Sequence, residues 1–451
     1  MPGVPADPAV SAPRRLDRAV AAAVVTGPLI DLGELRHSSD PDPLPRPPRA
    51  VGRPLRCVLV LLLLLATLAS AGVPPRRDVV SIPAGLAAET LLAGDLFVVL
   101  DPSPAQPSQR TLRAFRLPGG GLLWQTRVPV QGRAWGVSSV GGMLLATVHE
   151  SNMPGQGTLS VAFDRETGAY RWQQPGSPVE LADGNVLMQS GGGDEPFGLR
   201  ALDPCCGTVR WQLTADAHVS FRYGGRGADR VVLNQVDGPV EVRDAGTGAV
   251  LARADVRPPG SGWPGVTQVV DDLLLTIGGT PATITAYGLD RLDRRWSVPA
   301  ERAEFALGCG PVLCLHVGGV GLRAVDPTTG QPRWHSDRWT WVFPYDGRLM
   351  ASTANSSGTR LEQLVVLDPM TGREVAGLGR WELAQSGFGD PLIGVRRHPA
   401  GGLYVTRLDA RAGEARPLDV LPEAAGNCQS SVSWLLCQRV NGSYQLFRWS
   451  D

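Results

Sequence analysis

The stretch LSVAFDRETGAYRW, from Leu159 to Trp172, contains an apolar strand, an Asp, a Thr-Gly pair and a closing aromatic residue. The same order returns in LRALDPCCGTVRW, which ends at Trp211, and in LRAVDPTTGQPRW, which ends at Trp334. Weaker versions fill the intervals between these copies. A recurrence at about 40 residues indicates a repeat architecture, in which each unit buries its faces only against its neighbours.

Each copy of this phrase predicts two strands joined by a tight turn. An Asp at the start of a turn accepts hydrogen bonds from the backbone just after it, and Gly tolerates a positive φ, so Asp326 and Gly330 suit the reversal. A closing Trp could bury about 150–250 Å² against the next unit. We therefore expect five tryptophans to dock neighbouring units: Trp124, Trp172, Trp211, Trp296 and Trp334.

A second apolar strand precedes most copies of the phrase, and a shorter strand often precedes that one, so each unit holds four strands. Four-stranded antiparallel sheets repeated around an axis form a β-propeller, which leaves only short protected edges. The phrase resembles the repeat of the PQQ-like (quinoprotein-type) β-propeller family, whose blades carry D-x-x-T-G and a docking Trp. This resemblance covers nearly everything after residue 78 and implies an all-β propeller of four-stranded antiparallel blades. The WD40 family fits less well, because no Trp-Asp dipeptide closes the strands.

The phrase occurs eight times, and a ninth strand pair follows at residues 433–440 and 444–449 without a further partner. We expect strands drawn from residues 78–117 to pair with it and close the ring. Eight blades is the favoured number, nine is the strict count, and seven is an alternative. In this interpretation residues 86–451 form the propeller, and residues 74–85 form a linker that could supply a closing strand.

The composition excludes several function classes. The formal net charge is +0, so no basic surface indicates a nucleic-acid partner. All 43 basic residues are Arg, and the absence of Lys excludes a Walker-type phosphate loop and Schiff-base chemistry. The 55 Gly and 39 Pro suit short strands with many turns.

A continuous apolar run, CVLVLLLLLATLASAGV, extends from Cys57 to Val73. As a helix it lies at the lower end of what spans a hydrocarbon core of about 30 Å. We predict that residues 55–73 are a transmembrane signal anchor and that residues 57–73 hold the protein at the membrane. The alternative is a cleaved signal peptide, because Ala69-Ser70-Ala71 fits the cleavage pattern, but the 56 residues before the run far exceed an ordinary n-region.

Residues 1–54 are rich in Pro and Arg and poor in aromatic residues, which predicts a disordered tail. More arginines flank the apolar run on its N-terminal side than on its C-terminal side. Arg46, Arg49, Arg53 and Arg56 precede it, whereas Arg76 and Arg77 follow it. The positive-inside rule therefore predicts a single-pass membrane protein with a cytoplasmic N-terminus and an extracytoplasmic propeller.

Four cysteines are placed to form two disulfides. Cys309 and Cys314 flank a short hairpin, which would set them opposite each other, and Cys428 and Cys437 flank a longer loop that leads into the closing strands. Cross-strand pairs lie at Cα distances compatible with a disulfide, and the predicted compartment is oxidising. Each bond would stabilise the fold by about 2–3 kcal/mol through loop entropy.

The adjacent Cys205 and Cys206 raise the question of an enzyme. In PQQ-dependent alcohol dehydrogenases, which the repeat resembles, a vicinal disulfide packs on the quinone. Here the two cysteines occupy the turn of the D-x-x-T-G phrase, away from the expected central axis. A structural turn disulfide or a pair of free thiols is the favoured interpretation.

No other catalytic or metal-ligating pattern is evident. The six His show no H-x-x-x-H or H-E-x-x-H spacing, and no G-x-S-x-G elbow or Gly-rich dinucleotide fingerprint occurs. We therefore expect no catalytic, cofactor-binding or metal-binding residues. The favoured function is a non-catalytic binding or scaffolding propeller for an envelope protein, peptide or glycan, and the alternative is a PQQ-dependent oxidoreductase of the cell envelope. Similarity to the propeller of outer-membrane assembly rests on fold analogy alone.

The predicted topology can be tested with protease added to intact cells that express the full chain. An epitope in the propeller should be degraded and an epitope within residues 1–54 should survive, because only the propeller lies outside. Immunoblotting against both epitopes measures the outcome. Recovery of a soluble cytoplasmic propeller after fractionation would contradict the anchor.

Overall fold

The structure, a computed structural model, describes the following residues: 57–63, 80–103, 109–130, 132–149, 157–192, 195–235, 238–256, 266–318, 321–353, 361–387 and 389–448. The chain divides into two units, Met1–Arg76 and Arg77–Asp451. In the first unit residues 57–63 are helical. No helix among the described residues is long and apolar enough to cross a membrane. The predicted tail at residues 1–54 and the remainder of the predicted anchor lie outside the described residues.

The second unit is all-β. Six of its sheets contain four strands each, paired in chain order. Their strands are β2 (Glu89–Ala93), β3 (Leu96–Pro102), β4 (Arg110–Arg116) and β5 (Gly121–Arg127); β6 (Arg133–Val140), β7 (Met143–His149), β8 (Thr158–Asp164) and β9 (Tyr170–Pro175); β10 (Ser177–Glu180), β11 (Val186–Gly192), β12 (Glu195–Leu202) and β13 (Val209–Ala215); β14 (Ala217–Gly224), β15 (Gly227–Gln235), β16 (Val240–Asp244) and β17 (Val250–Ala254); β18 (Val266–Val270), β19 (Leu273–Gly278), β20 (Thr283–Gly288) and β21 (Arg294–Pro299); β22 (Ala303–Cys309), β23 (Val312–Val317), β24 (Gly321–Val325) and β25 (Pro332–Ser336).

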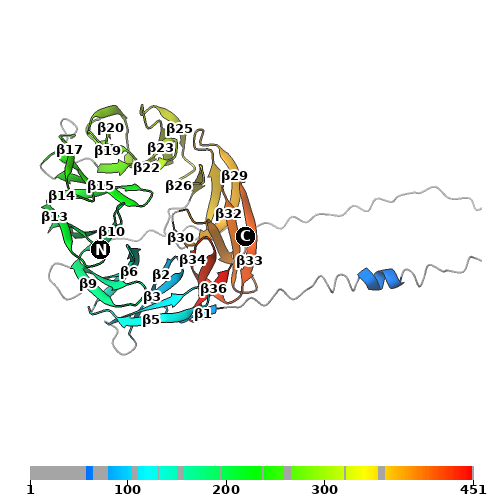
Figure 1. Ribbon diagram of the computed structural model, residues 1–451. Coiled ribbons are helices and arrows are strands. Elements are labelled where there is room, and N and C mark those ends of the chain that lie inside the picture. Colours follow the sequence, from blue (N-terminus) through cyan, green and yellow to red (C-terminus); the bar gives the residue numbers. More distant parts are fainter. Residues whose placement is uncertain are drawn as a thin grey trace, which may run out of the picture. The chain divides into compact units, whose positions relative to one another are not determined.

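Two larger sheets complete the described part of this unit. The seven-stranded sheet contains β26 (Trp341–Tyr345), β27 (Arg348–Ser352), β28 (Glu362–Leu367), β29 (Glu374–Leu383), β31 (Ile393–Arg397), β32 (Leu403–Asp409) and β33 (Glu414–Leu421). The five-stranded sheet contains, in spatial order, β1 (Val80–Ile82), β36 (Tyr444–Arg448), β35 (Trp434–Arg439), β34 (Ala424–Ser430) and β30 (Gln385–Ser386). Figure 1 shows the sheets of this unit around a central axis, with β2, β6, β10 and β22 toward the middle and β5, β9, β13 and β25 toward the outside.

The second strand of each blade explains the continuous apolar runs in the sequence. Strand β3 begins with LFVVL, five buried residues, and alternate residues point to opposite faces of its sheet. Leu96, Val98 and Leu100 pack in a core shared with the β6–β9 sheet, whereas Phe97 and Val99 pack in a core shared with β1, β35 and β36. A strand that is buried on both faces needs apolar residues at every position.

The described strands form eight sheets, which matches the favoured number of blades. The number is eight for a different reason than expected, because the closing strands do not share a sheet with β2–β5. The closing strands β35 and β36 form a sheet separate from β2–β5. Instead, β29 is long enough to pair with β28 and then, through Glu382 and Leu383, with β31. The seven-stranded sheet therefore holds two groups of strands, β26–β29 and β31–β33. With the six four-stranded sheets and the closing sheet these make nine groups, and nine hydrophobic clusters of described residues lie between neighbouring groups.

The N-terminal strand closes this arrangement. Strand β1 pairs antiparallel with β36, and Val80 faces Leu446 while Ile82 faces Tyr444. Ile82 is fully buried in the cluster that joins the closing sheet to β2–β5. The outer strand of the closing sheet therefore comes from the opposite end of this unit, which leaves no C-terminal strand edge open at β36.

Replacing Ile82 with Ala should destabilise the unit through its closing contact. Removing a buried Ile side chain typically lowers the free energy of unfolding by about 2–5 kcal/mol. Ser81→Ala is the matched control, because Ser81 is exposed on the same strand. Denaturant unfolding of the full chain measures both variants, and an I82A midpoint equal to the S81A midpoint would place closure elsewhere.

Candidate functional site

Five tryptophans connect each of their sheets to the next through one recurring contact. The Nε1–H of Trp172, in β9, donates a 2.8 Å hydrogen bond to the carbonyl oxygen of Pro204 in the next sheet's turn. The indole ring also covers Gly207, whose φ is 67° and where an added Cβ would lie 2.6 Å from the ring. Only Gly satisfies both conditions. Four further pairs make the same contact at 2.8 to 3.1 Å: Trp124 with Arg165, Trp211 with Ala245, Trp296 with Pro327 and Trp334 with Pro369.

An alanine stands directly opposite every one of these tryptophans. Trp172 pairs with Ala162 across β8 and β9, and Trp334 pairs with Ala324 across β24 and β25. The corresponding residues in the other three sheets are Ala114, Ala201 and Ala286. Because cores pack densely, a small partner leaves the space that the indole occupies against the next turn.

Two sheets carry a different residue pair at this register position. Ala252 stands opposite Val242 in one of them, and Ala376 stands opposite Val366 in the other. In these two sheets the larger side chain of the pair, Val242 or Val366, lies on the third strand, whereas in the other five sheets it is the Trp of the fourth strand. In the turn of the next sheet, Leu292 stands where the docking turns have Gly, with a φ of 54°, and its side chain packs in the same hydrophobic cluster as Ala252.

The closing contact follows the same plan with a smaller residue. Val80 of β1 packs over Gly120, which has a φ of 66° and where an added Cβ would collide with the Val80 side chain. The strand that closes the unit therefore docks on the turn of the first sheet as the tryptophans dock on theirs.

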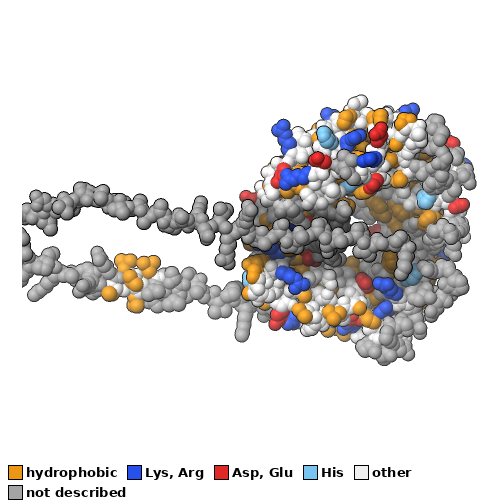
Figure 2. Space-filling model, turned by 180° about the vertical axis from the view of Figure 1, so that it is seen from behind, with side chains coloured by type: hydrophobic (Ala, Val, Ile, Leu, Met, Phe, Trp, Pro, Cys, Tyr) orange, Lys and Arg blue, Asp and Glu red, His pale blue; other side chains and the backbone are white. Residues whose placement is uncertain are grey.

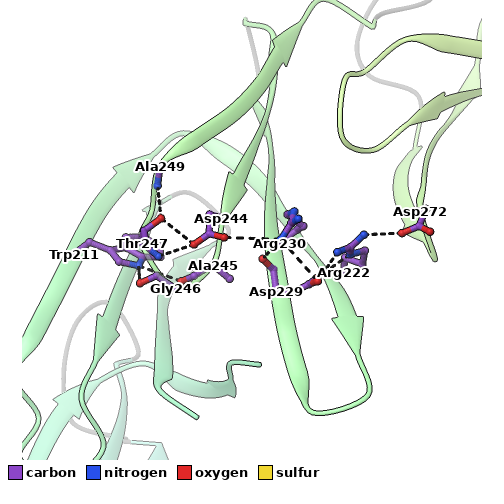
Figure 3. A network of polar contacts seen from close by, with 10 residues as sticks. All are labelled: Trp211, Arg222, Asp229, Arg230, Asp244, Ala245, Gly246, Thr247, Ala249 and Asp272. Carbon is purple, nitrogen blue, oxygen red and sulfur yellow. Dashed lines mark hydrogen bonds and ion pairs between the residues drawn. The ribbon is translucent and has the colours of Figure 1, made fainter. Parts of the chain in front are cut away.

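Figure 3 shows how one docking turn connects three successive sheets. Trp211 of β13 donates to the carbonyl oxygens of Ala245 and Gly246, both at 3.1 Å. Within the turn, Oδ1 of Asp244 accepts hydrogen bonds from the backbone N–H and the hydroxyl of Thr247, at 2.9 and 2.8 Å. The Oδ2 atom of Asp244 lies 3.9 Å from Arg230.

Arg222 extends this network to the following sheet. It forms an ion pair with Asp229 in its own hairpin and a 2.6 Å ion pair with Asp272, which lies between β18 and β19 (Figure 3). The Arg222 guanidinium holds the pKa of Asp229 below its usual value, and Asp229 in turn raises the pKa of Arg222. The polar chain thus runs from Trp211 to Asp272 across three sheets.

The turn carboxylates are held in the ionised form. Hydrogen bonds from Arg171 and then from Thr167 lower the pKa of Asp164 to about 2. Thr328 and Arg333 likewise lower the pKa of Asp326. These carboxylates organise turns and are not poised to exchange protons near neutral pH.

The structure contains both disulfide bonds, Cys309–Cys314 and Cys428–Cys437, with Cα–Cα distances of 5.8 and 4.1 Å. The expectation that Cys309 and Cys314 stand directly opposite each other was wrong. Cys309 faces Val312 and Leu307 faces Cys314, so this disulfide runs diagonally between β22 and β23 and not between directly opposite residues.

Cys205 and Cys206 are exposed and free, between β12 and β13 at the outer part of their sheet. Their Sγ atoms lie 2.7 Å apart, and this contact raises the pKa of Cys205 to about 12 and lowers the pKa of Cys206. With a carboxylate oxygen of Asp203 they form a set of three ligand atoms within 4.8 Å of one another. The sequence contains no His spacing that would have indicated this set, although the adjacent Cys-Cys pair and the turn Asp were a local signal for it.

A pocket of about 520 Å³ lies where the inner strands β2, β30 and β34 approach one another. Its lining combines hydroxyl and amide groups, one carboxylate and one indole with the aliphatic side chains of Leu91, Leu92 and Val432. The polar groups and the indole belong to Thr90, Gln385, Ser386, Asp390, Gln429, Ser430, Ser431, Ser433 and Trp434. The Nε2 of Gln429 donates to the hydroxyl and the carbonyl oxygen of Thr90, at 2.7 and 3.2 Å. These two residues lie 339 positions apart, so no local pattern predicted this axial pocket.

Two further hollows lie away from the axial pocket. One, of about 770 Å³, is lined by Arg380, Arg396 and Arg397 together with Glu382. The other, of about 1080 Å³, contains Tyr223, Glu180 and Asp183. Figure 2 shows acidic and basic side chains interspersed over the described residues of the face that it displays, in keeping with the neutral net charge.

The docking contact can be tested at Trp296, which is 7% exposed. Trp296→Ala should lower the free energy of unfolding by about 3–5 kcal/mol, the usual range for a buried Trp. Trp296→Phe retains one aromatic ring but removes the Nε1–H donor to Pro327 and part of the buried indole, so it should cost less than Trp296→Ala but more than the roughly 1 kcal/mol of the hydrogen bond alone. Trp135→Ala is the control because Trp135 is 74% exposed, and equal denaturation midpoints for W296A and W135A would contradict the docking role.

Comparison with known proteins identifies part of the chain. Residues 108–271 match the model of the PQQ_2 family, which is described as outer membrane protein assembly factor BamB. No curated protein gives a significant match to the chain.

Solved structures similar to the chain have low identities. BamB from Moraxella catarrhalis is 14% identical, with a TM-score of 0.37 over 62% of this chain and 92% of that one. The computationally designed Ika8 protein is 14% identical, with a TM-score of 0.41 over 82% and 98% of the two chains. A europium-containing methanol dehydrogenase is 12% identical, with a TM-score of 0.39 over 82% and 84%. Residues 108–271 belong to the PQQ-like β-propeller repeat family that the recurring phrase predicted.

Proposed function

We propose that the chain is a non-catalytic, membrane-anchored propeller outside the cytoplasm that binds a protein, peptide or glycan in its axial pocket. The composition of this pocket carries the proposal. Thr90, Ser386, Ser430, Ser431 and Ser433 offer hydroxyl groups, each of which can donate and accept hydrogen bonds. These hydroxyl groups, next to the aliphatic Leu91, Leu92 and Val432, suit a ligand with both polar and apolar surface, such as a sugar or a peptide.

The size and the indole of the pocket support the same proposal. Its volume of about 520 Å³ lies within the range of about 300–1,000 Å³ that is usual for ligand sites. Trp434 is half-buried at one side and presents an apolar body next to the serines. An aromatic face beside hydrogen-bonding groups suits the mixed polar and apolar surface of a sugar ring or a peptide side chain.

The proposed location rests on other residues. The apolar run at residues 57–73 and the arginines before it support a signal anchor with the propeller outside. The two disulfides, Cys309–Cys314 and Cys428–Cys437, suit an oxidising compartment.

The second candidate, a PQQ-dependent oxidoreductase, is favoured only by the family of the repeat. A quinone enzyme must hold its cofactor, tune it and place a base within hydrogen-bond reach of the substrate. The Cys205–Cys206 pair lies between the two outermost strands of its sheet, where it is not directed at the axial pocket. We therefore rank this candidate below the binding propeller.

Filling the axial pocket should abolish ligand binding without affecting the fold. The test variant combines Ser386→Arg and Ser431→Arg, which place two long side chains into the pocket from β30 and from the residue after β34. Gly225→Arg is the matched control, since Gly225 is exposed in a different hollow and an added Cβ there meets nothing within 4 Å. Arrays of oligosaccharides and of peptides, followed by titration of each hit, should give binding to wild type and G225R that S386R/S431R loses.

Hits that bind S386R/S431R as tightly as wild type would refute the axial pocket as the site. A second arm supplies the purified full chain with PQQ and calcium. We expect no alcohol-dependent dye reduction, and reduction at a rate that saturates with PQQ would favour the oxidoreductase.

A further inference from the structure

One docking turn departs from its relatives at two adjacent positions. Four turns of the phrase have a Thr before the Gly, in the sequences DRETG, DAGTG, DPTTG and DPMTG, which begin at Asp164, Asp244, Asp326 and Asp368. The fifth, which begins at Asp203, reads DPCCG. In each of the four, a Thr hydroxyl within the turn donates to the Asp carboxylate, at 2.5 to 2.9 Å.

The DPCCG turn keeps the backbone function of the Asp and exchanges the hydroxyl for thiols. Oδ1 of Asp203 accepts the backbone N–H of Cys205 at 3.1 Å. The Sγ of Cys206 instead contacts the hydroxyl of Thr208 at 3.3 Å. The DPCCG turn therefore lacks the hydroxyl-to-carboxylate hydrogen bond of the other four turns. It places two exposed thiols next to a carboxylate.

We propose that Asp203, Cys205 and Cys206 form a binding site for a thiophilic divalent cation, of the class of Cd²⁺ or Zn²⁺. On binding, both thiols release their protons to water, two sulfur–metal bonds form, and no electron is transferred. The Asp203 carboxylate supplies a third ligand, and water completes a tetrahedral set. This site is independent of the axial pocket.

The geometry and the charge of the turn permit this arrangement. Bonds of about 2.3 Å to a tetrahedral ion require the two sulfur atoms to stand about 3.8 Å apart. The present separation is 2.7 Å, and both side chains are exposed and have room to rotate outward. Two thiolates and a carboxylate around a divalent ion leave one negative charge, and Arg210 lies 3.6 Å from the second oxygen of Asp203.

The site also lies within a contact that holds two sheets together. Trp172 donates to the carbonyl oxygen of Pro204, the residue between Asp203 and Cys205, and its ring covers Gly207. An ion that binds only the folded turn stabilises the fold by mass action, so it should strengthen this junction.

The test uses the full chain with Cys57→Ser, which removes the other free cysteine among the described residues, under conditions that leave Cys309–Cys314 and Cys428–Cys437 intact. Titration with Cd²⁺ should produce thiolate-to-cadmium charge-transfer absorbance that saturates at one ion per chain, with release of up to two protons per ion and a rise in melting temperature. Asp203→Asn should weaken the binding and retain the absorbance, because both thiolates remain.

The matched control is the double substitution Cys205→Met and Cys206→Thr, which reproduces the DPMTG sequence of the turn at Asp368. This variant should fold normally and lose both the absorbance and the rise in melting temperature. The same absorbance in the control, or none in the parent with Cys57→Ser, would overturn the site. Non-reducing peptide mapping that finds Cys205 joined to Cys206 in protein from its native envelope would overturn it as well, because a disulfide leaves no thiolate to bind the ion.

Discussion

The structure depends on the contact between an indole on one sheet and the glycine turn of the next. This contact combines a large buried ring with one directed hydrogen bond from Nε1–H to a turn carbonyl, as at Trp172 and Pro204. The ring excludes any side chain at the glycine, and the carboxylate at the start of the turn fixes the carbonyl that accepts the bond. One short phrase therefore encodes both a hairpin and the attachment site for its neighbour.

The exceptions show that a junction without an indole is filled by other apolar side chains. Where Trp is replaced by Ala, as at Ala252, the opposite Ala becomes Val242 and a leucine enters from the next turn. At the closing junction Val80 takes the indole's place over Gly120. Dense packing explains these exchanges, because an unfilled junction would leave a cavity between sheets.

The proposed functions occupy positions that the repeat leaves free. The axial pocket lies on inner strands, whose polar residues are not needed for the indole contacts of the outer strands. The proposed cation site, Asp203 with Cys205 and Cys206, lies in a docking turn and surrounds Pro204, whose carbonyl oxygen accepts the hydrogen bond of Trp172. A repeat can thus acquire a site by changing a few side chains while its backbone and its junctions stay the same.

The sequence alone predicted the all-β repeat, the five docking tryptophans and the two cysteine pairs, because each depends on residues within one hairpin or on a phrase that recurs. The diagonal path of Cys309–Cys314 was not predicted, since it depends on the register of β22 and β23. The pairing of β1 with β36 confirms the closing strand that the sequence predicted within residues 78–117. The sheet shared through β29 and the contact of Thr90 with Gln429 were decided only by the tertiary structure. The physical reason is that small rotations between successive units add up around the axis, and only their sum determines which distant strands meet.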